Sequence, residues 1–326
     1  MMDYLIGKKS KSRVRLLFNM EKKMKKYLPE VCSTLNELNN LVNISFLNEG
    51  YSDEQKYILT TSDGIKYLLR LSKPKDLKRK FDELEKMLQC FSLGVKCSEP
   101  IRYGLTSDKE CFYSLLSWIK GSDGVKTIRE LSKNDQFDVG VKSGKDLKLI
   151  NSIKSDSSVV CWSDRFLSKH KLYYEIYKQS NIRFDEEAYV LHFIKENTEL
   201  LEDRPSLFLH DDFHLSNIII HSNKYAGTID FNRCDYGDPW HEFVKMYMYS
   251  SELSIPFCHG QLNGYFGKAL SNDFLTVSSV YLAATIISTL VWTKRIIPHE
   301  MNQSKKRIRR ILEEFNNFKS NKPTWL

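Results

Sequence analysis

The sequence contains no apolar run long enough to act as a secretory signal or to cross a membrane as a helix. The apolar stretch at residues 4–7 is far too short for either role. The later stretch at residues 280–292 is also short and is interrupted by threonine and serine, so we interpret it as a buried helix. We therefore expect a cytoplasmic protein without a membrane partner.

The sequence also has no Cys-x-x-Cys pair, although it contains seven cysteines. An odd number of irregularly spaced cysteines indicates neither a disulfide framework nor a zinc site. We expect free thiols in a reducing compartment. We find no internal repeat and no low-complexity tract either.

Most of the chain carries no excess of positive charge, although the formal net charge is +8. Residues 1–30 and 294–310 each carry a net of +6, whereas residues 121–290 carry a net of −5. Charge runs of this kind are usually solvated faces or arms. No nucleic-acid-binding module surrounds the basic run at residues 305–310, so nucleic acid is not an expected partner.

A length of 326 residues suits two lobes better than one small core. Turn signals at residues 48–50 and 62–64 separate short runs of strand-forming residues in the first part of the chain. The pattern predicts a five-stranded sheet with one helix at residues 77–91. The expected strands lie near residues 44–47, 56–59, 66–70, 101–103 and 112–116.

Beyond a glycine-containing break at residues 121–124, the apolar periodicity becomes helical. Three short strands are expected near residues 206–208, 217–220 and 226–229, where they would present polar residues at their ends. We divide the chain into three parts. These are a basic N-terminal extension or helix at residues 1–30, an N-lobe at 31–120 with a hinge at 117–121, and a helical C-lobe at 121–326.

The most informative residues are Asp212, Asn217 and Asp230, which lie in the segments His-Asp-Asp-Phe-His-Leu-Ser-Asn and Ile-Asp-Phe-Asn. Four residues separate the first Asp from the Asn, and the second Asp follows the Asn by thirteen positions. A kinase-type site uses one carboxylate to meet the acceptor hydroxyl, with an amide and a second carboxylate to hold magnesium on the phosphates. The spacing therefore predicts phosphoryl transfer.

These segments, with Gly-Asp-Pro at residues 237–239, resemble the aminoglycoside phosphotransferase family, whose common form is H-G-D-x-x-x-x-N, I-D-x-G and G-D-P. The resemblance covers roughly residues 40–300. It implies an α+β, two-lobed protein-kinase-like fold with a small antiparallel-sheet N-lobe and a larger, mainly helical C-lobe. It also implies that Asp212 orients the acceptor hydroxyl, that Asn217 and Asp230 bind Mg²⁺, and that His210 is structural.

Two positions depart from the family pattern. Asp211 stands where the family most often has glycine, and it adds a carboxylate beside Asp212. Asn232 replaces the glycine that usually follows Asp-Phe, and asparagine tolerates left-handed backbone geometry better than most residues. We read the isolated His214 and His241 as packing or surface residues.

The resemblance also assigns residues of the N-lobe to ATP or GTP. Arg70 occupies the position of the family's phosphate-contacting lysine, with Lys66 on the same strand face as the alternative. Glu83 matches the acid that pairs with this cation, and a solvated helix-face acid is the alternative. The positions implied for nucleotide binding are Gly50, Ser52, Arg70, Glu83, Ser117, Trp118 and Ile119.

The acceptor is not fixed by these motifs. The resemblance implies a small-molecule hydroxyl, on an aminoglycoside or other antibiotic with resistance as the outcome, or on choline, ethanolamine, homoserine or a sugar-like metabolite. A nucleotide-binding module without turnover is the competing class. Asp235, Asp238 and Glu242 are candidates to line the acceptor site, with Asp238 alternatively a structural anchor. We expect a monomer, with a dimer as the alternative.

Overall fold

The computed structural model describes residues 24–48, 54–155, 161–267 and 269–326, and the chain divides into two compact units. Unit 1 runs up to Leu93 and continues over Cys97–Ile119. Unit 2 comprises Gly94–Lys96 and Lys120–Leu326. The division after Ile119 lies one residue before the boundary drawn from the sequence, whereas the assignment of Gly94–Lys96 to the second unit was not foreseen.

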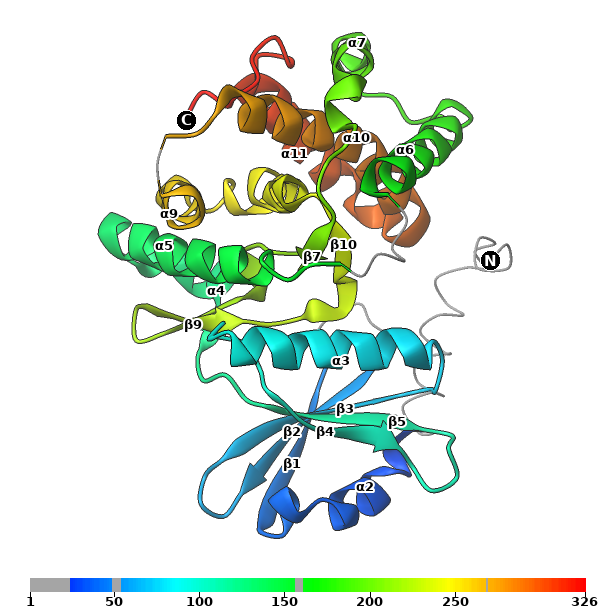
Figure 1. Ribbon diagram of the computed structural model, residues 1–326, viewed down its shortest axis with the longest axis vertical. Coiled ribbons are helices and arrows are strands. Elements are labelled where there is room, and N and C mark those ends of the chain that lie inside the picture. Colours follow the sequence, from blue (N-terminus) through cyan, green and yellow to red (C-terminus); the bar gives the residue numbers. More distant parts are fainter. Residues whose placement is uncertain (1–23, 49–53, 156–160, 268) are drawn as a thin grey trace. The chain divides into compact units, whose positions relative to one another are not determined.

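Unit 1 is built on an antiparallel sheet of five strands in the order β1-β2-β3-β5-β4 (Figure 1). Each of the five strands expected from the sequence is present, and the helix predicted at residues 77–91 is α3. The elements of the unit are α2 (Leu28–Thr34), η2 (Asn36–Leu38), β1 (Leu41–Leu47), β2 (Gln55–Thr61), β3 (Lys66–Ser72), α3 (Leu77–Ser92), β4 (Pro100–Leu105) and β5 (Phe112–Ser117).

The two faces of this sheet are covered by different helices, α3 on one side and α2 on the other (Figure 1). The segment containing α2 packs into the core of the unit through side chains at helical spacing, and these bury against Tyr57, Leu59 and Leu69 of the sheet. The side chains are Met24, Tyr27, Leu28 and Val31. The boundary drawn at residue 30 between an N-terminal extension and the N-lobe therefore divides a segment that belongs to one core. The lysines between these residues had suggested a basic extension.

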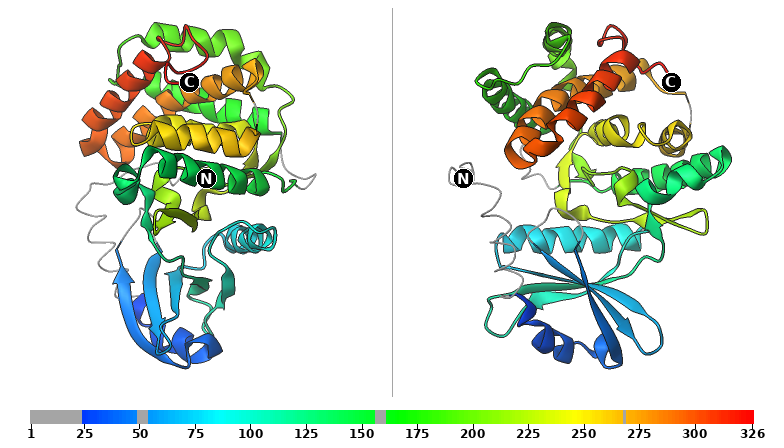
Figure 2. Two further views of the ribbon diagram at one scale, coloured as in Figure 1. Left: turned by 90° about the vertical axis from the view of Figure 1, so that its left-hand side faces the viewer. Right: turned by 180° about the vertical axis from the view of Figure 1, so that it is seen from behind.

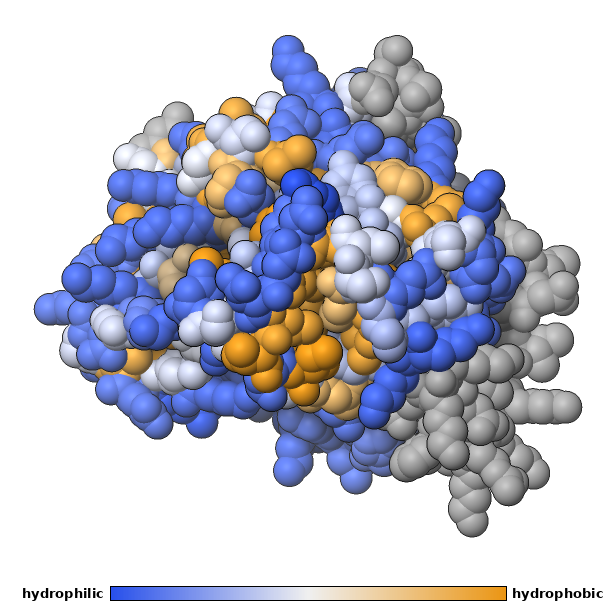
Figure 3. All heavy atoms as spheres, turned by 90° about the horizontal axis from the view of Figure 1, so that it is seen from below, coloured by the Kyte–Doolittle hydropathy of each residue, from blue (hydrophilic) through white to orange (hydrophobic). Residues whose placement is uncertain are grey.

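Edge strand β1 carries apolar side chains that remain exposed. Ile44 and Phe46 are 43% and 45% exposed, and they pair directly with the buried Leu59 and Tyr57 of β2. Directly paired residues point to the same face, so this row extends the face on which α2 packs. Figure 3, which shows the molecule from below, displays the apolar area of this part of the surface.

Within its described residues, unit 2 combines eight α-helices with two small antiparallel sheets, ordered β6-β8-β9 and β10-β7. Its strands are β6 (Ser122–Asp123), β7 (Leu207–Leu209), β8 (Ile218–His221), β9 (Lys224–Thr228) and β10 (Asp235–Gly237). Its helices are α4 (Gly124–Thr127), α5 (Lys133–Ile150), α6 (Trp162–Lys178), α7 (Glu187–Asn197), α8 (Phe243–Lys245), α9 (Ile255–Phe266), α10 (Asn272–Ile296) and α11 (Met301–Glu314).

Short 3₁₀ and π turns connect these elements, and three of them, η5, η6 and η7, carry residues of the candidate site. The turns are η3 (Ile128–Glu130), η4 (Thr198–Leu201), η5 (Leu215–Asn217), η6 (Phe231–Arg233), η7 (Pro239–Glu242), the π turn η8 (Met246–Ser250) and η9 (Pro298–Glu300). The resulting α+β organisation is the one expected from the sequence.

Helices α5 and α9 lie side by side with their backbones almost in contact (Figure 2). Glycines make this approach possible, because a Cβ on Gly260 would overlap the carbonyl oxygen of Phe137 and a Cβ on Gly264 would overlap that of Val141. Gly140 and Gly144 of α5 face α9 in the same way. These glycines also weaken the apolar periodicity of α5, since glycine interrupts the pattern of apolar residues expected of a helix.

Helix α10 forms the centre of unit 2. It is long and apolar enough to span a membrane by length and composition, with a mean hydropathy of 1.9, but 72% of its apolar window is buried inside the protein. Such burial is typical of a core helix, as predicted for residues 280–292.

The basic segment at residues 294–310 makes ion pairs within unit 2. Arg307 donates two hydrogen bonds of 3.0 Å to the carboxylate of Glu252, and Arg310 lies 3.8 Å from the same group. At least these two cations thus hold α11 in place. None of the seven cysteines forms a disulfide within the described part of the chain.

Candidate active site

The loop between β7 and η5 carries the predicted catalytic motif. Its His210 is fully buried, and Nε2–H donates to the carbonyl oxygen of Ile229 over 2.9 Å. The other ring nitrogen, Nδ1, accepts a hydrogen bond from the backbone N–H of Asp212 over 3.3 Å. Burial lowers the pKa of His210, which favours the neutral ring that this pattern requires. His210 therefore joins the catalytic loop to the segment that precedes Asp230.

The backbone of this loop is left-handed at Asp211, where φ is +56°. Glycine adopts this geometry without strain, which explains its frequency in the family motif. The carboxylate of Asp211 lies 3.0 Å from Nδ1 of His241. In the second segment of the motif the left-handed residue is Asp230, with φ +67°, whereas Asn232 lies within the right-handed turn η6, so its tolerance of left-handed geometry is not used.

Asp212 is surrounded by cationic or basic side chains. Its Oδ1 lies 2.9 Å from Nζ of Lys245 and 3.6 Å from Nε2 of His214, and its Oδ2 lies 3.8 Å from Nε of Arg233. Burial alone would raise the pKa of Asp212, but the hydrogen bond from His214 and the charges of Lys245 and Arg233 hold it well below its usual range. The group is therefore an ionised hydrogen-bond acceptor and a weak base.

Asn217 and Asp230 are brought together by backbone pairing, since the N–H of Ile229 donates to the carbonyl oxygen of Asn217 over 3.0 Å. The side-chain amide of Asn217 donates to the carbonyl oxygen of Asp212 over 2.8 Å, which leaves its own Oδ1 for another partner. The Oδ1 of Asp230 is buried and has no hydrogen-bond partner among the described residues. Such an oxygen pair suits Mg²⁺, which prefers oxygen ligands and completes its shell with nucleotide phosphates and water.

No group of three or more His, Cys, Asp or Glu side chains able to hold a metal ion occurs within the described ranges. Two side-chain ligands are what a phosphate-bound Mg²⁺ requires, so the residues fit a metal that arrives with its nucleotide.

Glu242 and Asp238 do not line a cleft, which corrects their assignment to the acceptor site. Both are 0% exposed. Glu242 accepts hydrogen bonds from the backbone N–H groups of His210 and Asp211 over 2.6 and 3.0 Å. Burial and the charge of Asp211 raise the pKa of Glu242 to about 8. Glu242 thus holds the backbone of the catalytic loop in place from the protein interior.

Asp238 is an internal anchor of the same kind. It accepts hydrogen bonds from Nε of Arg204 over 2.6 Å, from the hydroxyl of Tyr281 over 2.9 Å and from the backbone N–H of Trp240 over 3.0 Å. The third candidate acid, Asp235, is half-buried, and its two oxygens accept from the Arg165 guanidinium over 3.1 and 2.9 Å.

In unit 1, Arg70 is buried and ion-paired. Its guanidinium donates to Oε1 of Glu83 over 2.9 Å and to Oγ of Ser114 over 3.0 Å, and it lies 3.7 Å from Glu54. Lys66, the alternative cation, is exposed at the first residue of β3. Arg70 and Glu83 thus form the ion pair that the resemblance implies.

The remaining nucleotide-binding candidates lie at the end of unit 1 or outside the described residues. Ser117 ends β5, and its Oγ accepts the backbone N–H of Glu99 over 2.8 Å. Trp118 and Ile119 follow as half-buried residues at the end of unit 1. The two loop candidates, Gly50 and Ser52, lie outside the described residues.

Sequence reasoning missed Lys245 and Arg233, and it read His214 as a packing or surface residue. Arg233 follows Asp230 by three positions on η6, so its place in the motif region could have suggested a role. Lys245 belongs to the short helix α8, thirty-three residues after Asp212. Its only signal was a lysine within an otherwise apolar stretch.

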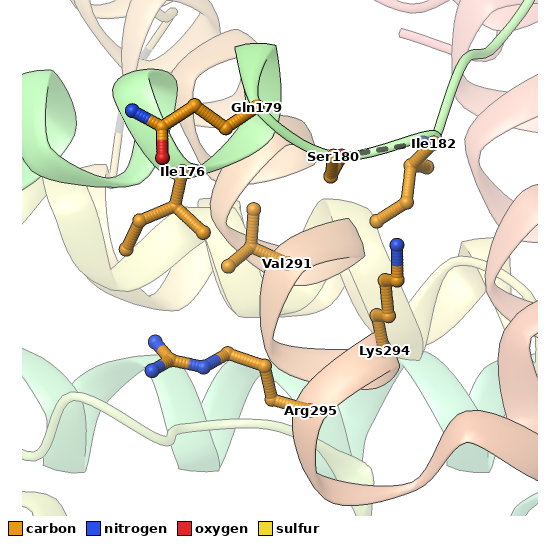
Figure 4. A pocket seen from close by; sticks show the side chains of 7 residues that line it. All are labelled: Ile176, Gln179, Ser180, Ile182, Val291, Lys294 and Arg295. Atoms are coloured by element: carbon orange, nitrogen blue, oxygen red, sulfur yellow. Dashed lines mark hydrogen bonds between the residues drawn. The ribbon is translucent and has the colours of Figure 1, made fainter. Parts of the chain in front are cut away.

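A separate cavity of about 430 Å³ lies beside the C-terminal ends of α6 and α10 (Figure 4). It is lined by Ile176, Gln179, Ser180, Ile182, Val291, Lys294 and Arg295. Tyr281, which binds Asp238 beside the catalytic loop, precedes Val291 by ten positions on α10, and this corresponds to about 15 Å of helix. The cavity is therefore distinct from the site around Asp212.

Comparison with known proteins places these features in a family. The model of the phosphotransferase enzyme family matches residues 43–274, which is more than half of the chain. No curated protein sequence matches.

Several solved structures are similar in fold. The ADP-bound aminoglycoside phosphotransferase APH(2'')-Ib matches 87% of this chain and 96% of its own, with a TM-score of 0.58 and 21% identity. The GDP complex of aminoglycoside 2'-phosphotransferase-IIIa matches 88% and 98%, with a TM-score of 0.64 and 13% identity. Amicoumacin kinase hAmiN, in complex with AMP-PNP, Ca²⁺ and Ami, matches 93% and 97%, with a TM-score of 0.61 and 14% identity.

Proposed function

Since the chain belongs to the phosphotransferase enzyme family, we propose that it is a kinase that transfers the γ-phosphate of ATP or GTP to a hydroxyl group of a small molecule. The observation that carries the proposal is the catalytic loop. There the ionised Asp212 lies beside Asn217, and the Oδ1 of Asp230, which no described residue hydrogen-bonds, is suited to a metal. The nucleotide complexes among the fold relatives support the choice of donor.

Asp212 would accept a hydrogen bond from the acceptor hydroxyl and aim its oxygen at the γ-phosphorus. The new oxygen–phosphorus bond forms as the bond from the γ-phosphorus to the bridging oxygen breaks, and a nucleoside diphosphate leaves. Because its pKa is low, Asp212 is a weak base, so it takes the hydroxyl proton late and passes it to solvent. Mg²⁺, when bound, supplies charge for the phosphate oxygens, and Asn217 with Asp230 would hold it.

Asp230→Asn is expected to raise the Mg²⁺ concentration needed for half-maximal activity and to weaken nucleotide binding, because the change removes an anionic oxygen from the metal. Titration of Mg²⁺ at fixed ATP, with calorimetry of Mg·nucleotide binding, measures both effects. Asp235→Asn is the matched control, since Asp235 pairs with Arg165. An unchanged Mg²⁺ dependence would reduce Asp230 to a turn residue.

Arg70 is proposed to contact the nucleotide phosphates while Glu83 holds it in place. The proposed contacts of unit 1 with the nucleotide also include Gly50, Ser52 and the hinge residues Ser117, Trp118 and Ile119. Arginine offers a planar fork where lysine offers a point charge, so the geometry at the phosphates is more demanding than in the common family pattern.

Arg70→Met is expected to raise the KM for nucleotide and to lower kcat, whereas Lys66→Met should leave both nearly unchanged because Lys66 is exposed at the start of β3. Arg70→Lys should restore activity only in part. Steady-state kinetics of the three variants under one set of conditions decide the matter. If Lys66→Met is instead the impaired enzyme, Arg70 serves only the internal ion pair.

The proposed acceptor is a hydroxylated small molecule, and two groups are carried forward. Aminoglycosides and other antibiotics form the first group, because several fold relatives are named as kinases of such compounds, with resistance as the consequence. Metabolites of the choline, homoserine or sugar type are the second group. We further propose that the protein acts in the cytoplasm as a monomer.

A nucleotide-binding protein without turnover is the alternative function, and the intact set of Asp212, Asn217 and Asp230 speaks against it. Transfer of radiolabel from [γ-³²P]ATP or GTP to acceptors, compared with nucleotide binding by calorimetry, separates the two. Transfer that depends on Asp212 supports the kinase. Tight nucleotide binding without transfer to any acceptor of a broad antibiotic and metabolite panel rejects it.

A further inference from the structure

We propose that the acceptor carries an anionic group, a carboxylate or a phosphate monoester, a short distance from the hydroxyl that is phosphorylated, and that Arg233 binds this group with help from Lys245. The inference rests on the proposed function and names the substrate class of the same site. It favours a hydroxy acid or a phosphorylated polyol over a polycationic antibiotic.

The first observation is the placement of the two cations about Asp212. Lys245 on α8 approaches Oδ1, and Arg233 on η6 approaches Oδ2, over 2.9 and 3.8 Å. Two positive charges thus flank one catalytic carboxylate. The Arg233 side chain is 54% exposed, against 17% for Lys245. Arg233 is therefore accessible to a ligand, whereas Lys245 is mainly internal.

The second observation is that the neighbouring acids are already paired. Asp235 binds Arg165, and Asp238 binds Arg204. A polycation needs acidic partners that are not already neutralised, and these two side chains do not provide them. Its own charges would instead meet Arg233 and Lys245, which disfavours binding by like-charge repulsion.

An anionic acceptor fits the same residues. The guanidinium of Arg233 can hold a carboxylate or phosphate through two parallel hydrogen bonds, which fixes orientation as well as position. With the anion on Arg233 and the hydroxyl on Asp212, a short carbon chain joins the two contacts. Lys245 compensates the charge of Asp212, so that an acceptor anion is not repelled by it.

The transferred phosphoryl group is also anionic, so Arg233 could bind either that group or the anionic group of the acceptor. The two cases lead to different expected results. A cation that serves the acceptor discriminates between charged and uncharged acceptors. A cation that serves only the phosphoryl group affects every acceptor equally and alters the KM for nucleotide.

The test uses the full chain and measures kcat/KM by coupled release of ADP or GDP. The acceptors are a panel of hydroxy acids and sugar phosphates, each with a matched uncharged and a matched cationic counterpart. One such set is D-glycerate, D-glyceramide and 3-amino-1,2-propanediol, and kanamycin serves as the polycation. We expect the anionic member to exceed its uncharged counterpart by roughly ten- to a hundredfold, the scale of a charge-assisted hydrogen bond.

Arg233→Ala should bring this ratio close to one while the KM for nucleotide stays within about twofold. Arg233→Lys should keep most of the ratio, because the charge remains. Arg309→Ala is the matched control, since Arg309 is exposed and pairs with Asp185 on the surface of the same unit. Because Arg233 is itself largely exposed, its replacement leaves the fold intact, and a melting curve verifies this.

Preference for the uncharged or cationic counterpart, or a ratio that Arg233→Ala does not change, overturns the inference and leaves the proposed kinase activity standing. Equal loss for all acceptors in Arg233→Ala assigns the cation to the phosphoryl group and also overturns it. Absence of transfer to all three classes, with nucleotide still bound, overturns the inference, and the broad antibiotic and metabolite panel then decides the proposed function.

Discussion

Asp212→Ala is expected to lower kcat for phosphoryl transfer by about 10²–10⁴, the usual scale for removing a group that handles the reacting proton. The structure gives the reason, because the carboxylate that would orient the hydroxyl is held in place by Lys245 and by the amide of Asn217. Nucleotide affinity should change little, since the proposed metal ligands remain. Single-turnover kinetics with the preferred acceptor and calorimetry with nucleotide measure the two quantities separately.

Two further variants serve as controls for Asp212→Ala. Asp212→Asn keeps the shape of the side chain and can still accept from Lys245, so its activity should fall as well while its melting temperature stays closer to wild type. Asp185→Ala removes an acid that is 72% exposed and should leave kcat unchanged. Turnover of Asp212→Ala within a few-fold of wild type would contradict the assignment.

Gly260→Ala is expected to destabilise the protein, although the same change in a helix ordinarily stabilises it by roughly 0.5–1 kcal/mol. The added Cβ would overlap the backbone carbonyl of Phe137, which cannot rotate away as a side chain would. Overpacking of a tight interior usually costs about 1–3 kcal/mol, and rigid backbone on both sides favours the upper part of that range. Chemical denaturation at equilibrium measures the free energy of unfolding directly.

Asn263→Ala is the matched control for this prediction, because residue 263 is exposed on the same helix. Surface changes of this kind usually stay within about 0.5 kcal/mol. A free energy of unfolding for Gly260→Ala equal to or above that of the wild type would show that α5 and α9 are not in backbone contact.

The catalytic motif could be located from the sequence because its parts are local. His210, Asp212 and Asn217 lie in one loop, and β8 and β9 form a hairpin that brings Asp230 back beside them. Short spacing in the chain therefore implies proximity in space. The same reasoning applies to Arg70, whose strand leads directly into the helix that carries Glu83.

The roles of Glu242 and Asp238 could not be predicted in this way. Acidic residues are usually exposed, and burial of Glu242 is tolerated because backbone N–H groups of the catalytic loop satisfy its oxygens. Backbone donors leave no pattern of side chains in the sequence. Lys245 escaped notice for a related reason, because its partner is distant along the chain.

In two helical segments another constraint outweighs apolar periodicity. In α5, Gly140 and Gly144 lower helix propensity, yet they are required by the closeness of α9. Before α2, the lysines suggested a basic arm, while Met24, Tyr27 and Leu28 already followed the three- and four-residue spacing of a buried helix.

The α5–α9 contact also sets an order of events during protein synthesis. Gly140 and Gly260 are separated by 120 positions in the chain. A ribosome adding about 5–20 residues per second needs roughly 6–24 s to cover that interval. During this time the glycine face of α5 lacks its partner, and the catalytic loop is completed before α9 is made. Unit 2 can therefore close its core only after α9 has been made, so a nascent chain that stops before Ile255 would hold every proposed catalytic residue and still expose the surface on which chaperones act.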